Sequence, residues 1–439
     1  MVNNLIEKIK TSDSVKPGGV VVRAIGLTVE ATGPQAPVGD VCSIRPSQTT
    51  KDRNEHGEIL AEVVGFKEGK TILMPIGDTT GVAPGDSVVS IGKPLETPVG
   101  YELLGRVLDG LGNPIDGKGS LLECERASVF REPTDSLKRP RIQEVLPLGI
   151  KAIDGLLTIG RGQRVGIFSG SGVGKSTLLG MMSRFTEADI AVIALVGERG
   201  REVRDFIERE LGEEGLKRAV VVVATSDQPP LMRIRAAYTA TTISEYFRDQ
   251  GRDVLLMMDS VTRFCRAMRE VGLSVGETPG QRSYPPSVFS TLPKLLERAG
   301  TSERGSITGL YTVLVDADDM NEPVADNVRG ILDGHIVLSR DLAHRNHYPA
   351  IDILQSISRL MTEIVDEDQL NAAGHIKELM AEYENVRDMI NLGAYVEGAD
   401  PKVDEARRKM PAIENFLRQR MNERFDRETT LKQLLEAVA

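Results

Sequence analysis

Residues 165–177 read Val-Gly-Ile-Phe-Ser-Gly-Ser-Gly-Val-Gly-Lys-Ser-Thr, and the rest of the chain can be interpreted outward from them. A short apolar run, the predicted strand, leads into a glycine-rich turn, and Lys175-Ser176-Thr177 opens a predicted helix. Glycine lacks a Cβ, so successive backbone N–H groups of such a turn can point inward at a polyphosphate. The positive end of the following helix adds to this attraction. The stretch therefore indicates a phosphate-binding loop.

Within this loop, Lys175 is expected to reach the β- and γ-phosphates of a nucleotide, and the Ser176 hydroxyl to bind Mg²⁺. The further predicted nucleotide contacts are Ser171, Gly172, Val173, Gly174 and Thr177. The strict pattern has its first glycine at position 169, where this chain has serine, a small residue that should still allow the loop to close. The alternative is a glycine-rich turn that matches by chance.

Composition limits the classes of protein that this chain can belong to. With 439 residues, 40% hydrophobic and 27% charged, it should form two or three globular domains. No apolar run approaches the ~20 residues of a membrane span, the start lacks a secretion signal, and three scattered cysteines suit neither a disulfide framework nor a zinc site. A cytoplasmic protein is predicted. The net charge of −10 and the absence of Trp argue against nucleic acid as a partner.

The pattern of predicted strands and helices changes along the chain and predicts a three-part α/β architecture. Its parts are a small N-terminal β-barrel, a central RecA-like P-loop domain with a parallel sheet, and a C-terminal α-helical domain. Short β-rich runs separated by glycine come first, then strands alternating with helices, then helices alone. The predicted limits are 1–17 for an N-terminal segment (a partner-binding helix or a frayed end), 18–92 for the barrel, 93–365 for the P-loop domain and 366–439 for the helical domain.

Two carboxylates follow buried strands of the predicted parallel sheet. Asp259 comes after an apolar run at 254–258, where the phosphates and Mg²⁺ should lie, and is the candidate metal-orienting residue. Glu198 follows the run at 190–196 and is the candidate general base that aligns a water for attack on the γ-phosphate. The alternative for Glu198 is an exposed turn charge or an ion-pair partner of Arg201.

Arginines are the candidates for stabilising the transition state. Arg263 lies four residues after Asp259 and could reach the γ-phosphate. Arg359 is far along the chain and cannot be placed by local reasoning.

Several motifs of this chain, taken as a set, resemble those of known protein families. Residues 170–176, 197–202, 259–263 and 347–352 resemble the catalytic (beta) subunits of rotary ATP synthases. Four further segments resemble the ATPases of type III secretion, most closely the flagellar export form, which is the flagellum-specific ATP synthase. These segments are 284–289, 318–323, 333–340 and 393–395. The likeness runs from about residue 18 to the C-terminus.

The resemblance implies an ATP phosphohydrolase that uses ATP and Mg²⁺, and it implies roles for individual residues. Lys175 and Ser176 would bind phosphate and Mg²⁺, Glu198 would activate the attacking water, Asp259 would orient the metal, and Arg199 and Arg263 would lie close to the γ-phosphate. Tyr348 would pack against adenine, although an ordinary core aromatic is the alternative. Arg359 matches the arginine finger that one subunit supplies to its neighbour's nucleotide.

The resemblance also implies an assembly and a location. Members of the family form homohexameric rings, which would energise protein export through the flagellar type III apparatus. The implied partners are a peripheral stalk regulator, a central stalk-like protein, a membrane export gate, and export substrates with their chaperones. The chain would be cytoplasmic and peripherally associated with the export apparatus of the inner membrane.

Four alternatives stay open at this point. The chain resembles virulence (injectisome) type III ATPases as well, and a rotary synthase subunit with unlike partners is a less favoured reading. An RNA-translocating hexamer of the transcription-terminator kind also joins a β-barrel to a P-loop core, but the acidic balance counts against it. A non-catalytic ring subunit would usually lack a carboxylate at the position of Glu198.

Overall fold

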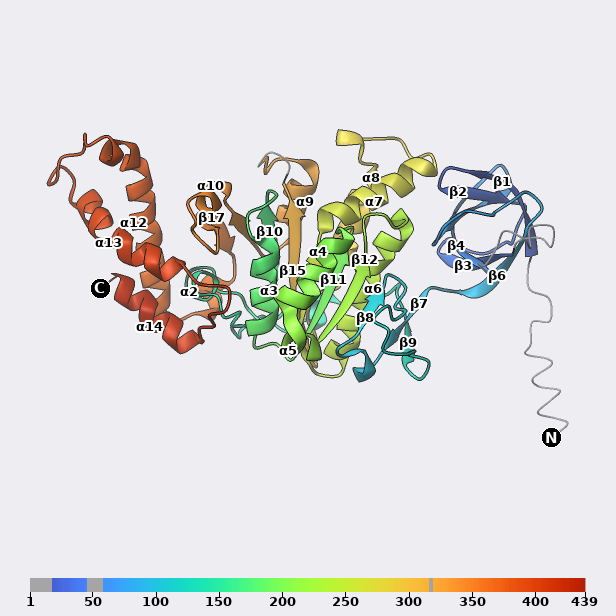
Figure 1. Ribbon diagram of the computed structural model, residues 1–439, viewed down its shortest axis with the longest axis horizontal. Coiled ribbons are helices and arrows are strands. Elements are labelled where there is room, and N and C mark those ends of the chain that lie inside the picture. The colour runs from blue at the N-terminus through green and yellow to red at the C-terminus, as the bar shows by residue number, and fades with distance from the viewer. Residues whose placement is uncertain (1–17, 46–57, 316–318, 439) are drawn as a thin grey trace.

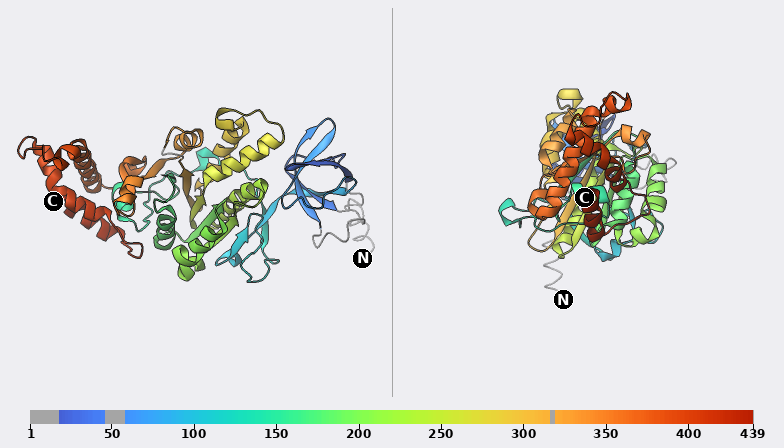
Figure 2. Two further views of the ribbon diagram at one scale, coloured as in Figure 1. Left: turned by 45° about the horizontal axis from the view of Figure 1, so that its top comes forward. Right: turned by 90° about the vertical axis from the view of Figure 1, so that its left-hand side faces the viewer.

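The computed structural model describes residues 18–45, 58–315 and 319–438, so the predicted segment 1–17 lies outside the described residues. Three units follow one another along the long axis of the molecule: a β-barrel, a central α/β unit and a helical unit (Figures 1 and 2). The predicted fold class is confirmed. Among the described helices, none combines the length and the apolar character that crossing a bilayer requires.

The barrel closes through six antiparallel strands in the order β1-β2-β5-β4-β3-β6. The strands are β1 (Gly18–Ile25), β2 (Thr28–Ala31), β3 (Asp40–Arg45), β4 (Ile59–Lys67), β5 (Lys70–Pro75) and β6 (Ser87–Pro94). Side chains at alternate positions, such as Val21, Ala61, Val63 and Leu73, fill its interior. The predicted runs at 19–22, 57–65, 71–75 and 86–90 correspond to β1, β4, β5 and β6. Sequence reasoning missed β2 and β3, which have only four and six residues, and β3 (Asp-Val-Cys-Ser-Ile-Arg) does not alternate polar and apolar residues.

The connector between the barrel and the phosphate loop contributes to the central sheet. Its elements are β7 (Glu96–Val99), η2 (Tyr101–Leu103), β8 (Val107–Asp109), β9 (Glu125–Ser128) and η3 (Ser136–Lys138). The strands β7 and β9 pair with each other, whereas β8 runs parallel to β12 (Ala219–Ala224) and forms one edge of the large sheet. The segment 106–115, which reads as a simple hairpin, therefore completes the core of the P-loop unit.

The central sheet has the order β17-β16-β10-β15-β13-β11-β12-β8, with β14 paired to β15. Its other strands are β10 (Arg164–Ser169), β11 (Ile190–Val196), β13 (Asp253–Asp259), β14 (Gly300–Thr301), β15 (Ser306–Leu314), β16 (Gly334–Leu338) and β17 (Ile351–Ser358). Strands β10, β15, β13, β11 and β12 are parallel, so their carboxyl ends meet at one edge. The edge strand β17 is antiparallel to β16.

Two hydrophobic cores lie on the two faces of this sheet. Along β11, Ala191, Ile193 and Leu195 point into one core, and Val192 and Ala194 point into the other. This division explains why β11 is an uninterrupted apolar run, as parallel strands covered on both faces usually are. The helices of this unit are α2 (Lys151–Leu156), α3 (Lys175–Phe185), α4 (Gly200–Asp205), the π-helix η4 (Phe206–Leu211), α5 (Gly212–Lys217), α6 (Pro230–Asp249), α7 (Val261–Ser274), η5 (Gln281–Ser283), α8 (Pro286–Leu296), α9 (Pro323–Ile331), α10 (Arg340–His344) and α11 (Met361–Ile364).

The C-terminal unit consists of α12 (Glu367–Asn391), α13 (Pro401–Leu417) and α14 (Arg427–Val438). The sequence predicts helices at 369–391, 404–417 and 430–438, which begin within three residues of the observed starts and end at the observed ends. The side chain of Asp366 caps α12 by accepting the Gln369 N–H, and Asp400 caps α13, which begins at a proline. The three helices pack on one another and on α2, so the helical unit lies against the face of the core that carries α2 and α3 (Figure 1).

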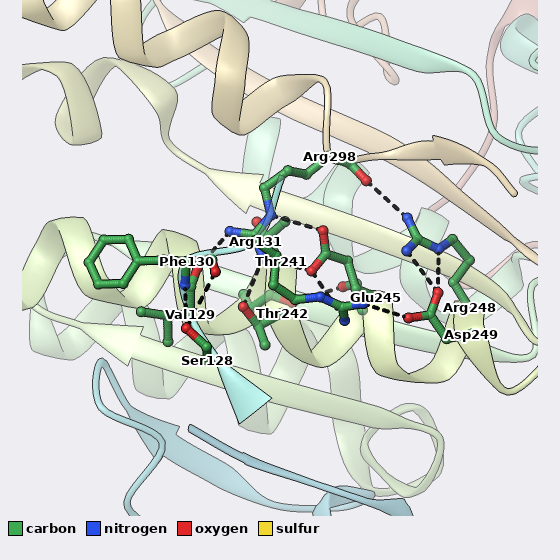
Figure 3. Close-up of polar contacts among 12 residues, drawn as sticks. Ser128, Val129, Phe130, Arg131, Thr241, Thr242, Glu245, Arg248, Asp249 and Arg298 are labelled. Carbon is green, nitrogen blue, oxygen red and sulfur yellow. Dashed lines mark hydrogen bonds and ion pairs between the residues drawn. The ribbon is translucent and has the colours of Figure 1, made fainter. Parts of the chain in front are cut away.

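A buried ionic network fastens the connector to the core (Figure 3). The Arg298 guanidinium donates to both carboxylate oxygens of Glu245, at 2.9 and 2.7 Å, and its Nη1 donates to the Val129 carbonyl at 2.8 Å. Arg131 reaches from the connector to Asp249 at 2.9 Å. A second buried pair joins Glu62 of the barrel to Arg235 of α6. These contacts hold the barrel, the connector and α6 together; the Arg298–Glu245 and Arg235–Glu62 pairs are almost fully buried, whereas Arg131 and Asp249 are each 38% exposed.

Candidate nucleotide-binding and catalytic site

The predicted phosphate loop joins β10 to α3, as expected from its sequence. Gly174, which precedes the helix, has a left-handed backbone conformation with φ of 86°, and α3 begins at Lys175. A Cβ at Gly174 would also come within 3.3 Å of the Tyr348 ring, so two constraints require glycine there. Ser169 is buried at the end of β10, and the turn forms with serine at this position.

The two carboxylates predicted from strand ends meet at the lysine of the loop. The Lys175 Nζ lies 2.5 Å from Asp259 Oδ1 and 3.8 Å from Glu198 Oε1. The register of the sheet brings this about, because β11 and β13 are neighbours and Leu195 pairs with Asp259. The side chains of Glu198 and Asp259 are only 9% and 5% exposed, so Glu198 is not a solvated turn charge.

Arg263 completes this group. Its Nε lies 3.1 Å from Glu198 Oε1, and its Nη2 donates to Glu198 Oε2 at 3.3 Å. The arginine packs directly on Gly197, where an added Cβ would lie 2.8 Å from Arg263 Cδ. The partner of Glu198 is thus Arg263, while Arg201 pairs with Asp205.

The electrostatics of Glu198 suit an acid–base group. Burial raises the pKa of its carboxyl to about 7, helped by the Asp259 charge and by a hydrogen bond with Glu202, and opposed by the charges of Lys175 and Arg263. The same hydrogen bond lowers the pKa of Glu202. A carboxyl with a pKa near neutrality can accept a proton and release it again during turnover.

The oxygen atoms near the loop fit Mg²⁺. Ser176 is exposed at the start of α3, and Asp259 uses Oδ1 for its bonds to Lys175 and to the Thr312 hydroxyl (2.7 Å), so neither bond involves Oδ2. Hydroxyl and carboxylate oxygens are the ligands that Mg²⁺ prefers, with phosphates and water filling the remaining positions. In keeping with such a sparse set, the described residues contain no cluster of three or more His, Cys, Asp or Glu suited to a metal.

A wide cavity of about 1760 Å³ continues from the loop toward the C-terminal unit. It is lined by Gly172, Gly174 and Thr177 at the phosphate end. Tyr348 and Pro349 form one wall beyond, and Lys151, Phe416 and Phe425 lie deeper. The Tyr348 side chain is about two-fifths exposed, which separates it from an ordinary core aromatic. The cavity therefore has one end beside the loop and an aromatic end beside the helical unit, and charged side chains such as Arg418, Arg420 and Glu423 also line it.

Two predicted site residues lie away from this cluster. The Arg199 side chain is 76% exposed and pairs with Glu202 at 3.1 Å. Arg359 follows the edge strand β17, is exposed, and donates to the Arg329 carbonyl at 3.3 Å. Neither has a contact with Lys175, Glu198 or Asp259 among the described interactions.

Sequence reasoning missed several residues of the site. Thr312 lies on β15, between β10 and β13, and orients Asp259; the only signal was a hydroxyl inside an apolar strand. Glu210 of the π-helix η4 was also missed; it accepts a hydrogen bond from the predicted residue Thr177 at 3.0 Å, which ties the loop to the segment after Glu198. Lys151, Phe416 and Phe425 carried no local signal, because they join the cavity only through tertiary packing.

Three family models match the chain in succession. The ATP synthase alpha/beta family beta-barrel domain matches residues 21–92, the nucleotide-binding domain of the same family matches 149–358, and the T3SS EscN ATPase C-terminal domain matches 365–436. Together these matches follow the three units of the fold.

Individual relatives cover almost the whole chain. The flagellum-specific ATP synthase of Bacillus subtilis (strain 168) is 52% identical over 96% of this chain and 95% of that protein. Among solved structures, the assembled ATPase EscN from the enteropathogenic E. coli type III secretion system has a TM-score of 0.90 and 47% identity, covering 96% of this chain and 100% of EscN. EscN in complex with its central stalk EscO has a TM-score of 0.87 and 46% identity, with the same coverage.

Proposed function

The chain belongs to the ATP synthase alpha/beta family of P-loop ATPases, in the branch of flagellar and type III secretion ATPases, and on this premise we propose that it hydrolyses ATP as a homohexameric ring that energises flagellar protein export. The observation that carries the proposal is the position of Glu198, buried beside the loop lysine and held by Arg263. A subunit that only binds nucleotide has no use for a buried carboxylate at this place.

The residues of the site divide the work of phosphoryl transfer. Lys175 neutralises the β- and γ-phosphates, Ser176 and Asp259 hold Mg²⁺, and Arg263 lies close to the γ-phosphate. Bound Mg²⁺ supplies positive charge to the phosphate oxygens. Glu198 takes a proton from the attacking water, and Tyr348 packs against adenine at the aromatic end of the cavity. Positioning and charge stabilisation of this kind provide most of the rate in such enzymes.

A ring explains the two arginines that lie away from the cluster. Arg359 is exposed beyond the edge strand, as a residue that acts on a neighbouring subunit's nucleotide must be. An arginine finger typically raises the rate of hydrolysis by roughly 10³- to 10⁵-fold. Arg199 is also exposed, and we assign it to the γ-phosphate side of the completed site.

The partners proposed for the ring follow from its relatives. EscN, which shares the fold over its whole length, has been solved with a central stalk, so a central stalk-like protein is the first partner proposed here. A peripheral stalk regulator, the membrane export gate, and export substrates with their chaperones complete the set. The ring would work in the cytoplasm, peripherally associated with the export apparatus of the inner membrane.

A flagellar role is favoured over a virulence role by a narrow margin of likeness. Identity is 52% to the flagellum-specific ATP synthase of Bacillus subtilis, 49% to the type 3 secretion system ATPase of Xanthomonas euvesicatoria, and 47% both to EscN and to the flagellum-specific ATP synthase of Salmonella typhimurium.

The experiment that tests the proposal measures ATP hydrolysis per subunit as a function of protein concentration. If each active site is shared between two subunits, specific activity rises with concentration and reaches a plateau where light scattering reports a hexamer. Lys175→Ala provides the inactive control. Specific activity that is independent of concentration, or a monomer that is fully active, would contradict the proposal that the active sites are shared between subunits of a ring.

A further inference from the structure

The aromatic end of the cavity is lined by a lysine whose side chain is largely buried. Lys151 is the first residue of α2 and is only 6% exposed, yet it lines the cavity. Its Nζ lies 4.6 Å from the centre of the Phe425 ring and 5.6 Å from the centre of the Phe416 ring. Both rings line the same cavity. The cation therefore lies against two aromatic side chains in the wall of the cavity.

This ammonium lacks the partners that a buried lysine usually has. Within the described part of the chain no carboxylate or carbonyl oxygen bonds the Lys151 Nζ, and Glu423 acts on it only through its charge. Burial lowers the pKa of the Lys151 amine. The two rings supply cation–π attraction, but they leave the three N–H donors of the group without an acceptor. Because Lys151 lines the cavity, these donors are available to an acceptor on a bound molecule.

A single glutamine fixes the position of this lysine. Gln419, in the loop between α13 and α14, is buried, and its Oε1 accepts the Lys151 backbone N–H at 2.9 Å. Its Nε2 donates to the Gly149 and Glu423 carbonyls, each at 2.8 Å. Every polar atom of the amide is thus used to join the start of α2 to the C-terminal loop that carries Phe425.

The same glutamine also holds the opposite wall of the cavity. Its backbone N–H donates to the Tyr348 carbonyl at 3.0 Å. The Tyr348 ring lies over Gly174, close enough that a Cβ on that glycine would be 3.3 Å away. Three segments from distant parts of the sequence, at 149–151, 348–349 and 419–425, therefore meet at Gln419 and leave the Lys151 ammonium facing the space between them.

We propose that Lys151 contacts the nucleoside of the bound nucleotide, donating a hydrogen bond to a ring nitrogen of the base or to a ribose hydroxyl, and that Gln419 is the residue that positions it. This inference rests on the proposed function, which places the triphosphate on the loop and the base beside Tyr348. It assigns nucleoside recognition to the Lys151 amine in addition to the aromatic wall, and gives the Gln419 amide the role of positioning that amine.

Comparing two ligands tests the assignment, because one of them lacks the nucleoside. Binding of Mg²⁺-ATP and of Mg²⁺-tripolyphosphate is measured by titration calorimetry for the full chain. Lys151→Met keeps the length of the side chain and removes its charge and donors. Gln419→Ala removes the amide that joins the start of α2 to the C-terminal loop. Each variant should weaken ATP binding by roughly tenfold or more, which corresponds to about 1.4 kcal/mol, and change tripolyphosphate binding less than twofold. Lys402→Met and Gln250→Ala, at exposed positions, serve as matched controls and should change neither.

The other outcomes overturn the inference in distinct ways. Unchanged ATP binding in Lys151→Met would reject the proposed contact between Lys151 and the nucleoside. An equal loss of affinity for ATP and for tripolyphosphate would show a general disturbance of the site. A loss of ATP affinity in Lys151→Met but not in Gln419→Ala would leave the contact and reject the positioning role. If the unaltered chain bound neither ligand, the proposed function itself would fail.

Discussion

Arg263 Nε lies 3.1 Å from Glu198 Oε1, so the carboxylate that ends strand β11 is held by an arginine from the helix that follows β13. The contact crosses two neighbouring strands and depends on the small size of Gly197, on which the arginine packs. It fixes the direction of the Glu198 carboxylate while burial keeps the pKa of that group near neutrality. Orientation and proton affinity are therefore set by different features of the same site.

Replacing Glu198 by Gln should abolish most hydrolysis and leave nucleotide binding. The amide keeps the shape of the side chain but cannot take a proton from water, and general-base catalysis contributes about 10²- to 10⁴-fold. Steady-state phosphate release and binding of a fluorescent ATP analogue provide the two measurements. Turnover near that of the unaltered chain would reject Glu198 as the base.

The rate should depend on pH through Glu198. Its pKa is raised to about 7, and only the carboxylate form accepts a proton, so kcat/KM should rise with pH and level off above neutrality. The hydrogen bond with Glu202 is one cause of the raised pKa of Glu198. Glu202→Ala should therefore lower this pKa and move the acidic limb of the profile to lower pH.

A pH profile that is flat between about pH 6 and 8 would contradict this prediction. Glu208→Ala, which removes an exposed carboxylate bound to Arg204, is the matched control and should leave the limb where it is.

Two inactive variants should restore activity to each other if Arg359 acts across a subunit boundary. Arg359→Ala keeps the phosphate loop but removes the arginine finger. Lys175→Ala keeps Arg359 but disables the phosphate loop. In rings formed from an equal mixture, about a quarter of the sites should combine an intact loop with an intact neighbouring arginine. ATP hydrolysis by the mixture is the readout, and Arg304→Ala, at an exposed position, should be active alone. A mixture as inactive as its components would reject a role for Arg359 across the subunit boundary.

Breaking the Arg298–Glu245 pair should destabilise the protein strongly. Arg298→Met leaves the Glu245 charge buried and removes the bond to the Val129 carbonyl, and loss of one partner of a buried pair costs about 3–5 kcal/mol. Urea unfolding followed by circular dichroism measures the change. Arg201→Met, on an exposed side chain, should cost less than about 0.5 kcal/mol. A small effect for Arg298→Met would mean that the connector is held mainly by apolar packing.

The parts of this fold that depend on local pattern could be predicted from the sequence. The buried strands β11 and β12 are continuous apolar runs and were located to the residue, and the glycine-rich turn determined the phosphate loop. Asp259 and Glu198 followed from the rule that carboxyl ends of parallel strands share one edge. The short strands β2 and β3 escaped because four to six residues with polar positions carry little periodic signal.

The residues that sequence reasoning missed act through tertiary contacts. Thr312 orients Asp259 only because β15 lies beside β13, and that order cannot be obtained from the strands alone. Gln419 has no distinguishing sequence pattern, because its role comes from a contact with the start of α2 that only the folded chain makes. Among the described interactions, Arg359 has no contact with the cluster in the single chain, and its proposed role depends on a neighbouring subunit.

The strand β8 comes from the connector yet forms the outer edge of the central sheet beside β12. A chimera that joins the barrel and connector of one relative to the P-loop core of another would therefore carry a foreign edge strand, with its side chains matched to a different neighbour. Recombination between such genes should succeed at a crossover just after Pro94, where the barrel ends, and fail at one near residue 146, although both positions lie outside the catalytic motifs.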